Sequence, residues 1–398
     1  MGTFSLTRTV RRRTRTAAAS LSLLALAGLV CSGATAAQAS ARAAGSPGSS
    51  CPQGVTAGTA TIAGWSSSVP WRSVGRGWIL GDLAKSPTSR GTLYLVSPRG
   101  QRYRLGQAPA NSSLEDWSGS GTYALLLSQG IAATTGTIIV LNLHTGQTDS
   151  FTVYSSSPYQ PMSFSRPSGT AVLFSPGTNS GGSALPLQRF SLAGGLQLCY
   201  PTQFAQAGQV VGGYLENASG TELVLGTQNG LEVVSNAGQP IRAILTRGPS
   251  DSCQLLNWWN NENVVVTCSG QLLLYPLSGS RAVQLTSSRD IAAFLDAWQL
   301  PSGTYAEAAA CGTTWLEKLN SDGTATTLTI PGAADAGTVH PLGAYGNKLP
   351  LLIGGGCDGN FPYSFVDWYK PSTNVATTVL GGPAGGGYVT GAVLFRQS

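Results

Sequence analysis

The chain has 398 residues, of which 42% are hydrophobic and only 10% are charged, and it contains 52 Gly, 22 Pro and 7 Cys. The charge is too low for a coiled coil, and the apolar content is too high for global disorder. The formal net charge of +6 suggests a basic protein. Five of the basic residues lie within the first 15 positions, however, so the charge of the remaining chain has to be counted without them.

The N-terminus has the pattern of a secretory signal peptide. Its five arginines precede an apolar run of 14 residues from Ala17 to Val30, and residues 37–39 read Ala-Gln-Ala. We expect residues 1–39 to be removed, which would leave 18 basic and 17 acidic residues. We therefore predict a secreted protein with no transmembrane segment in its mature chain and no nucleic-acid partner. The general secretory and twin-arginine export routes both stay open.

After a Ser-, Gly- and Pro-rich lead-in over residues 40–69, which we expect to be flexible, the chain repeats two motifs. The first is an aromatic residue, a polar turn, Gly-Thr and an apolar strand, as in residues 116–127 (DWSGSGTYALLL) and 163–174 (SFSRPSGTAVLF). The second is a strand that runs into a Gly or Asn turn, first at residues 92–101 (TLYLVSPRGQ). Seven such copies are spaced 41 to 50 residues apart. Four short strands in about 45 residues are typical of one propeller blade.

The number of strands predicts how the ring closes. Seven copies of the second motif require seven hairpins, and only six complete ones lie between them. The C-terminal segment 388–395 (YVTGAVLF) would supply the missing inner strand beside residues 77–81. We predict an all-β, seven-bladed β-propeller over residues 70–398, with four-stranded antiparallel blades and the C-terminal strand in the first blade. Its inner strands would carry one aligned set of aromatic residues: Phe395, Trp117, Phe164, Tyr214, Trp258, Trp298 and Tyr345.

These repeats resemble the TolB-like family of seven-bladed propellers, whose blades carry an aromatic-Ser-x-x-Gly turn. The resemblance covers residues 70–397, with Ser120, Ser168, Ser219 and Ser302 where the family often has Asp. It implies the architecture, and it implies that the chain binds another macromolecule, because members mostly do so. Related propellers cap peptidases or act as lyases, so fold analogy does not select one activity. The low charge and the abundant Gly, Ser and Ala predict an actinobacterial source.

The cysteine count favours disulfides over a metal site. Signal cleavage would leave six: Cys51, Cys199, Cys253, Cys268, Cys311 and Cys357. An even number in an exported chain is typical of disulfides. Cys253 and Cys268 flank a hairpin centred on residues 260–261, so they would be directly opposed and bonded. We expect Cys311–Cys357 to join neighbouring blades and Cys51–Cys199 to attach the lead-in to the ring.

Few residues suggest catalysis. No G-x-S-x-G, G-x-x-x-x-G-K-[ST] or H-E-x-x-H motif occurs, and there are only two histidines. Glu115 and Asp296 fall just before inner-strand aromatics, where they would reach the central channel, and His340 falls where the seventh inner strand begins. These three residues would form a carboxylate–histidine site, with a divalent cation if one is used. The simpler interpretation is that both acids bond to backbone amides or water.

Aromatic side chains on the loop face, where the cysteines lie, suggest recognition. Tyr159, Phe361 and Tyr363 have few charges near them in sequence, which suits a sugar or a peptide. We therefore predict an exported, monomeric, non-enzymatic binding or scaffold protein that recognises an extracellular protein, peptide or glycan and needs no cofactor or metal. The alternative is a propeller lyase or hydrolase acting in the central channel.

Overall fold

The computed structural model describes residues 51, 55–66, 68–129, 135–154, 162–176, 185–200, 210–227, 230–245, 253–287, 293–355, 363–382 and 386–395. The predicted signal peptide over residues 1–39 lies outside this part of the chain. Tyr159, Cys357 and Phe361 also lie outside it.

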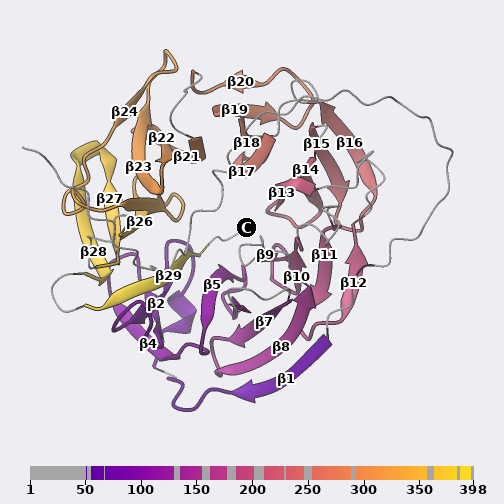
Figure 1. Cartoon of the computed structure of the whole chain (residues 1–398), viewed down its shortest axis with the longest axis vertical. Coiled ribbons are helices and arrows are strands. Elements are labelled where there is room, and N and C mark those ends of the chain that lie inside the picture. Colours follow the sequence, from indigo (N-terminus) through magenta and orange to yellow (C-terminus); the bar gives the residue numbers. More distant parts are fainter. Residues whose placement is uncertain are drawn as a thin grey trace, which may run out of the picture.

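Seven antiparallel sheets stand around a common axis and form the predicted seven-bladed propeller (Figure 1). From the inside outwards, blade 1 holds β29 (Tyr388–Leu394), β2 (Ile79–Ala84), β3 (Thr92–Val96) and β4 (Arg102–Gln107). Blade 2 holds β5 (Ser112–Trp117), β6 (Tyr123–Gln129), β7 (Thr135–Asn142), β8 (Gln147–Tyr154) and β1 (Val55–Thr61). Blade 3 holds β9 (Met162–Phe164), β10 (Ala171–Phe174), β11 (Gln188–Ser191) and β12 (Leu196–Cys199).

The other four blades follow the same order. Blade 4 holds β13 (Val210–Glu216), β14 (Glu222–Thr227), β15 (Gly230–Ser235) and β16 (Pro240–Leu245). Blade 5 holds β17 (Cys253–Asn260), β18 (Asn263–Cys268), β19 (Gln271–Pro276) and β20 (Val283–Gln284). Blade 6 holds β21 (Ala293–Leu300), β22 (Gly303–Ala310), β23 (Thr313–Leu319) and β24 (Ala325–Thr327). Blade 7 holds β25 (Thr338–Pro341), β26 (Leu349–Gly354), β27 (Phe365–Lys370) and β28 (Val375–Gly381).

The C-terminal strand closes the ring, as the sequence predicts. Strand β29 pairs antiparallel with β2, and Leu394 lies opposite Ile79. The backbone N–H of Phe395 donates to the carbonyl of Trp78 over 2.8 Å, which extends the pairing. Figure 1 shows this yellow strand beside indigo β2. Blade 1 is therefore built from the C-terminal strand β29 together with β2, β3 and β4, and the inner edge of β2 is paired.

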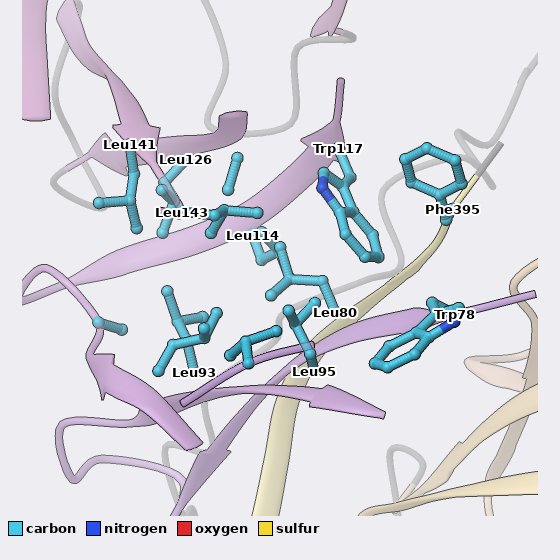
Figure 2. Close-up of a cluster of buried hydrophobic side chains, with 14 residues drawn as sticks. Trp78, Leu80, Leu93, Leu95, Leu114, Trp117, Leu126, Leu141, Leu143 and Phe395 are labelled. Carbon is cyan, nitrogen blue, oxygen red and sulfur yellow. The ribbon is translucent and has the colours of Figure 1, made fainter. Parts of the chain in front are cut away.

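The apolar core lies between neighbouring blades. Figure 2 shows Trp78 and Leu80 of blade 1 facing Leu114 and Trp117 of blade 2, within one cluster of buried side chains. The Trp117 ring meets the Phe395 ring edge-on at a centroid distance of 4.8 Å. Each sheet therefore has both of its faces covered by the neighbouring blades. A single four-stranded sheet could not bury both faces alone.

The lead-in is partly structured, in contrast to the flexible segment that we expected. Residues Val55–Thr61 form β1, which pairs antiparallel with β8 and gives blade 2 a fifth strand. The indole Nε1 of Trp65 then donates to the Leu143 carbonyl over 2.7 Å. Val and Thr suit a strand, and the outer edge of β8 offers unpaired backbone groups. Residues 55–66 therefore act as a strap along the circumference.

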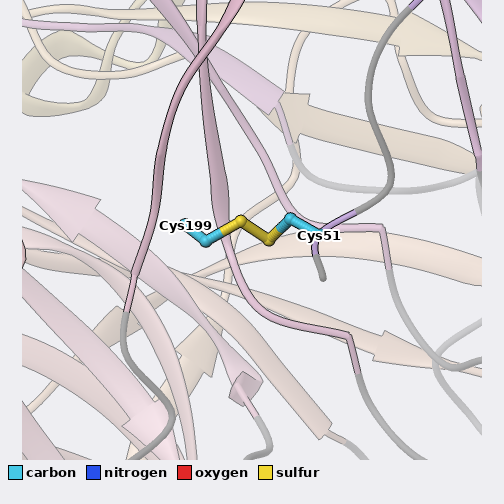
Figure 3. Close-up of a disulfide and its surroundings, with 2 residues drawn as sticks. All are labelled: Cys51 and Cys199. Atoms are coloured by element: carbon cyan, nitrogen blue, oxygen red, sulfur yellow. A yellow bond between two sulfur atoms is a disulfide. The ribbon is translucent and has the colours of Figure 1, made fainter. Parts of the chain in front are cut away.

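The structure contains two of the three expected disulfides. Cys51 is bonded to Cys199, which ends the outermost strand of blade 3, so the strap is attached there (Figure 3). Cys253 and Cys268 are directly opposed on β17 and β18 and are bonded. Cys311 is exposed and forms no disulfide with a described cysteine. Because Cys357 lies outside the described residues, the Cys311–Cys357 pair stays a prediction.

Two short 3₁₀ turns, Trp71–Ser73 and Pro371–Thr373, are the helical elements of the described chain. No helix in the described residues is long and apolar enough to cross a membrane.

Candidate functional site

A cavity of about 1150 Å³ opens at the centre of the ring, and its walls come from all seven blades. The residues that line it are Arg76, Gly77, Glu115, Met162, Ser163, Phe164, Arg166, Pro167, Tyr214, Leu215, Glu216, Asn217, Ala218, Ser219, Asn257, Trp258, Trp259, Asn260, Asn261, Trp298, Gly343, Ala344, Tyr345, Leu394 and Phe395. Many belong to the turns that join the inner strand of a blade to its second strand. The cavity is therefore the mouth of the central channel on the face that carries these turns.

The aligned aromatic residues meet at this mouth. Six of the seven line the cavity, because the repeat places each of them where an inner strand ends. Trp117 does not line it, since it is buried against Phe395 in the core. Trp259 adds a further ring. Four of the lining rings remain partly exposed: Tyr214, Trp258, Trp259 and Tyr345.

Glycines of the repeated turn allow neighbouring turns to pack closely around the mouth. Gly220 has a φ of +70°, and a Cβ there would lie 1.8 Å from the carbonyl oxygen of Arg166 in the preceding blade. Gly169 has a φ of +78°, and a Cβ there would lie 2.5 Å from the Cβ of Ser118. A side chain at either position would be strained and would also push adjacent blades apart. The Gly of the motif therefore sets the spacing between blades.

Charged groups connect three blades along one side of the cavity. The guanidinium Nη2 of Arg166 lies 3.2 Å from Oδ2 of Asp116, and Nη1 donates to the Trp117 carbonyl. Asp116 also accepts the backbone N–H of Phe164 at 2.8 Å. The backbone N–H of Arg166 in turn donates to Oε2 of Glu216 over 2.5 Å. Blades 2, 3 and 4 are thus joined at their inner ends by a chain of polar contacts.

Burial raises the pKa of both lining carboxyl groups. The pKa of Glu216 rises to about 7, since the loss of water outweighs the hydrogen bond from Arg166 and the charges of Arg189 and Arg166. Oε1 of Glu216 has no hydrogen-bond partner among the described residues. Burial also raises the pKa of Glu115, whose Oε1 accepts the Ser113 hydroxyl over 2.5 Å. Neither carboxylate has an ion-pair partner within the described part of the chain.

The three residues that we considered for catalysis lie in different surroundings. Glu115 lines the cavity, whereas Asp296 and His340 are not among its lining residues. Asp296 accepts a hydrogen bond from the side-chain amide of Asn257. It accepts a second one, over 2.8 Å, from the backbone N–H of Ala297. The acid beside His340 is Glu307, with its two carboxylate oxygens 2.9 and 3.0 Å from Nδ1.

Glu307 was missed by sequence reasoning because it lies on β22, the second strand of its blade. Its side chain is almost fully buried, while that of His340 is 41% exposed. The network residues Arg166 and Glu216 were missed as well. Both stand two positions after an aligned aromatic residue, Phe164 and Tyr214, and this common offset would have found them. Within the described residues, no group of three or more His, Cys, Asp or Glu is arranged to hold a metal ion.

The loop face, on which we predicted three aromatic residues, is the face of the propeller opposite the cavity. Tyr363 is 37% exposed and lies between β26 and β27, at the far end of these strands from the turn that borders the cavity. Tyr159 and Phe361 lie outside the described residues, so a binding surface made by these three side chains stays a prediction. The cavity itself belongs to the face that carries the inner hairpin turns.

Comparisons with known proteins support the architecture. No family model matches the chain, and no curated protein matches it. The β-propeller domain of the Trilobed protease from Pyrococcus furiosus is similar in structure, with a TM-score of 0.50 and 8% identity over 82% of this chain and 98% of that one. TolB from Acinetobacter baumannii is 13% identical, with a TM-score of 0.40 over 80% of this chain and 66% of its own.

A prolyl endopeptidase is 11% identical with a TM-score of 0.48; the match covers 82% of this chain and spans about half, 49%, of the endopeptidase. The match to the Pyrococcus propeller domain supports a common fold, and identities this low carry no activity with them. The chain is therefore a β-propeller, and its relation to the TolB-like family is one of resemblance.

Proposed function

We propose that the chain is an exported binding protein that holds a peptide or glycan in the mouth of its central channel without transforming it. The observation that carries the proposal is the aromatic cavity. Its volume of about 1150 Å³ is large enough for an oligomeric ligand. Partly exposed rings beside a few fixed polar groups suit the apolar faces and hydroxyl or amide edges of such ligands.

The compartment is supported by two independent features. The N-terminal sequence has the pattern of a signal peptide. The disulfides Cys51–Cys199 and Cys253–Cys268 are of the kind that persists in an oxidising environment outside the cytoplasm. On this basis we propose secretion and an extracellular ligand.

The test measures binding to the whole chain, produced with its own N-terminal segment. Isothermal titration calorimetry with short peptides and oligosaccharides should find a ligand whose affinity falls about tenfold or more in Trp258→Ala, because aromatic contacts dominate such sites. Trp315→Ala is the matched control, since Trp315 is also partly buried and hydrogen-bonded through Nε1 but does not line the cavity. Equal losses in both variants would refute the proposed site.

One observation favours a second candidate, a lyase or hydrolase. Glu307 holds the Nδ1 side of a half-exposed histidine, which is the arrangement that orients imidazole for proton transfer. Under this alternative, His340 oriented by Glu307 would transfer the proton, without Glu115, which lines a cavity that His340 does not line. Mass spectrometry of peptides and oligosaccharides incubated with the chain should then show products that His340→Gln no longer forms. Identical product profiles for both proteins would exclude this activity.

A further inference from the structure

The positive and negative side chains around the cavity differ in how far other protein groups already neutralise them. Arg166 is the cation in the wall, and its side chain is only 14% exposed. Both Nη2 contacts go to Asp116, at 3.2 and 3.3 Å, and Nη1 is bonded to a carbonyl. Its charge is therefore already neutralised by a carboxylate behind the wall. Arg76, the other lining cation, is exposed where the chain enters blade 1.

The two lining carboxylates are not neutralised in this way. Glu115 accepts a serine hydroxyl, and Glu216 accepts one backbone N–H. Neither contact supplies a positive charge, and withdrawal of a carboxylate from water is unfavourable unless a cation compensates it. The raised pKa values of both groups express their withdrawal from water, which for Glu216 outweighs the opposing charges of Arg166 and Arg189. The wall therefore has two acids that a cationic ligand would stabilise.

The aromatic rings of the wall also favour a positively charged ligand. Trp258 and Tyr214 lie in the wall beside Glu216, and the Trp258 indole is fixed by a 2.9 Å hydrogen bond from Nε1 to the Glu216 carbonyl. The faces of such rings attract cations, most strongly those of Trp. An anion would meet these rings and two carboxylates, with Arg76 alone in its favour. Charge and ring chemistry thus agree on a cation.

We propose that the cavity selects ligands that carry a protonated primary amine, and that Glu115 and Glu216 attract this charge. The inference rests on the proposed binding function and adds the chemical class of the ligand. A lysine side chain of a peptide and the amine of an amino sugar share this chemistry.

The experiment compares each amine with its acetylated form, which has nearly the same shape and no charge. The probes for calorimetry are a terminally blocked Ala-Lys-Ala peptide and its Nε-acetyl form, then glucosamine and N-acetylglucosamine. In at least one pair the amine should bind about tenfold more tightly, as is usual for hydrogen bonds to charged groups. The pair that shows the difference identifies the source of the amine.

The double variant Glu115→Gln/Glu216→Gln should remove this preference, so that it binds the amine and the acetylated probe with equal affinity. Glu222→Gln is the matched control, because Glu222 lies on the adjacent strand β14 and does not line the cavity. Equal binding of amine and acetylated probes would overturn the inference and leave the proposed function intact. Absence of binding by all four probes, together with binding of an unrelated ligand that Trp258→Ala weakens, would overturn it as well. If no ligand of any kind binds, the proposed function fails first.

Discussion

The contacts between neighbouring blades are apolar in one part of the ring and charged in another. Where blade 7 meets blade 1, the contact is apolar: Ile79, Leu380 and Val389 are buried in one cluster with Leu394. Where blades 2, 3 and 4 meet at the cavity, the inner contacts run through Asp116, Arg166 and Glu216. The inner ends of blades 2, 3 and 4 thus carry three charged side chains over two successive junctions, whereas the cluster between blades 7 and 1 is apolar.

The difference separates stability from recognition. An apolar junction gains free energy from each side chain that it removes from water. A junction of charged groups gains little, because desolvation offsets most of the attraction. The apolar seam of blades 7 and 1 therefore holds the ring closed, whereas the charged wall of blades 2 to 4 borders the cavity in which we propose that a ligand binds.

The largest expected effect comes from placing a charge in the apolar seam. Val389→Asp would bury a carboxylate on β29, where Val389 is 2% exposed. We expect it to lower the free energy of unfolding by at least about 4 kcal/mol in urea denaturation. Val375→Asp is the control, because Val375 is 52% exposed on β28, and its cost should stay within about 0.5 kcal/mol. Similar losses for both would show that the seam does not hold the ring.

A second effect, of about 3 kcal/mol, is expected when the charged wall loses one partner. Asp116→Ala leaves the guanidinium of Arg166 partly buried without its carboxylate, which is costly. In a double-mutant cycle with Arg166→Met, the coupling energy should reach at least about 1 kcal/mol, because the two groups are in contact. Additive losses in urea unfolding would mean that the pair contributes nothing beyond its separate contacts.

The seam was predictable from the sequence and the wall was not, for a physical reason. A repeat of 41 to 50 residues fixes where every inner strand falls, so the C-terminal segment had only one vacant place beside residues 77–81. The aromatic residues follow the same period, which is why six of the aligned seven meet at the cavity. Periodicity carries this information because the blades are copies of one unit.

Contacts that differ from blade to blade leave no such signal. Arg166 meets Asp116 across 50 residues, and Glu307 meets His340 across 33. The offset that Arg166 and Glu216 share from their aligned aromatic residues marks their positions, but the period does not predict which partner each one meets. The strap was missed for a related reason, since its partner on β8 lies some 90 residues away, as in the contact between Thr59 and Asp149. The sequence shows which residue types are present, but it does not show that the two members of such a pair are in contact.

The smallest expected effect is the share of the pH dependence of stability that comes from Glu216 in the charged wall. The pKa of Glu216 is about 7 in the folded chain, against about 4.3 for a glutamate in an unfolded chain. The folded state thus binds this proton more tightly, so the stabilisation is complete below the unfolded pKa and is lost as the pH rises through 7. Glu232 and Asp367, whose pKa values rise to about 7 and about 6 through burial, add to the same trend. We expect the free energy of unfolding to fall from about pH 5 to about pH 8.

The contribution of the wall to this slope is isolated by substitution. Glu216→Gln removes one titrating group and keeps the shape of the side chain, so the decline measured by urea unfolding between these pH values should become shallower. Glu222→Gln should leave it unchanged, since that carboxyl belongs to the same blade and does not line the cavity. Val389→Ala, at the apolar seam, should lower stability by a similar amount at every pH, because no charge changes there. A slope that Val389→Ala alters as much as Glu216→Gln does would erase the distinction between the two junctions.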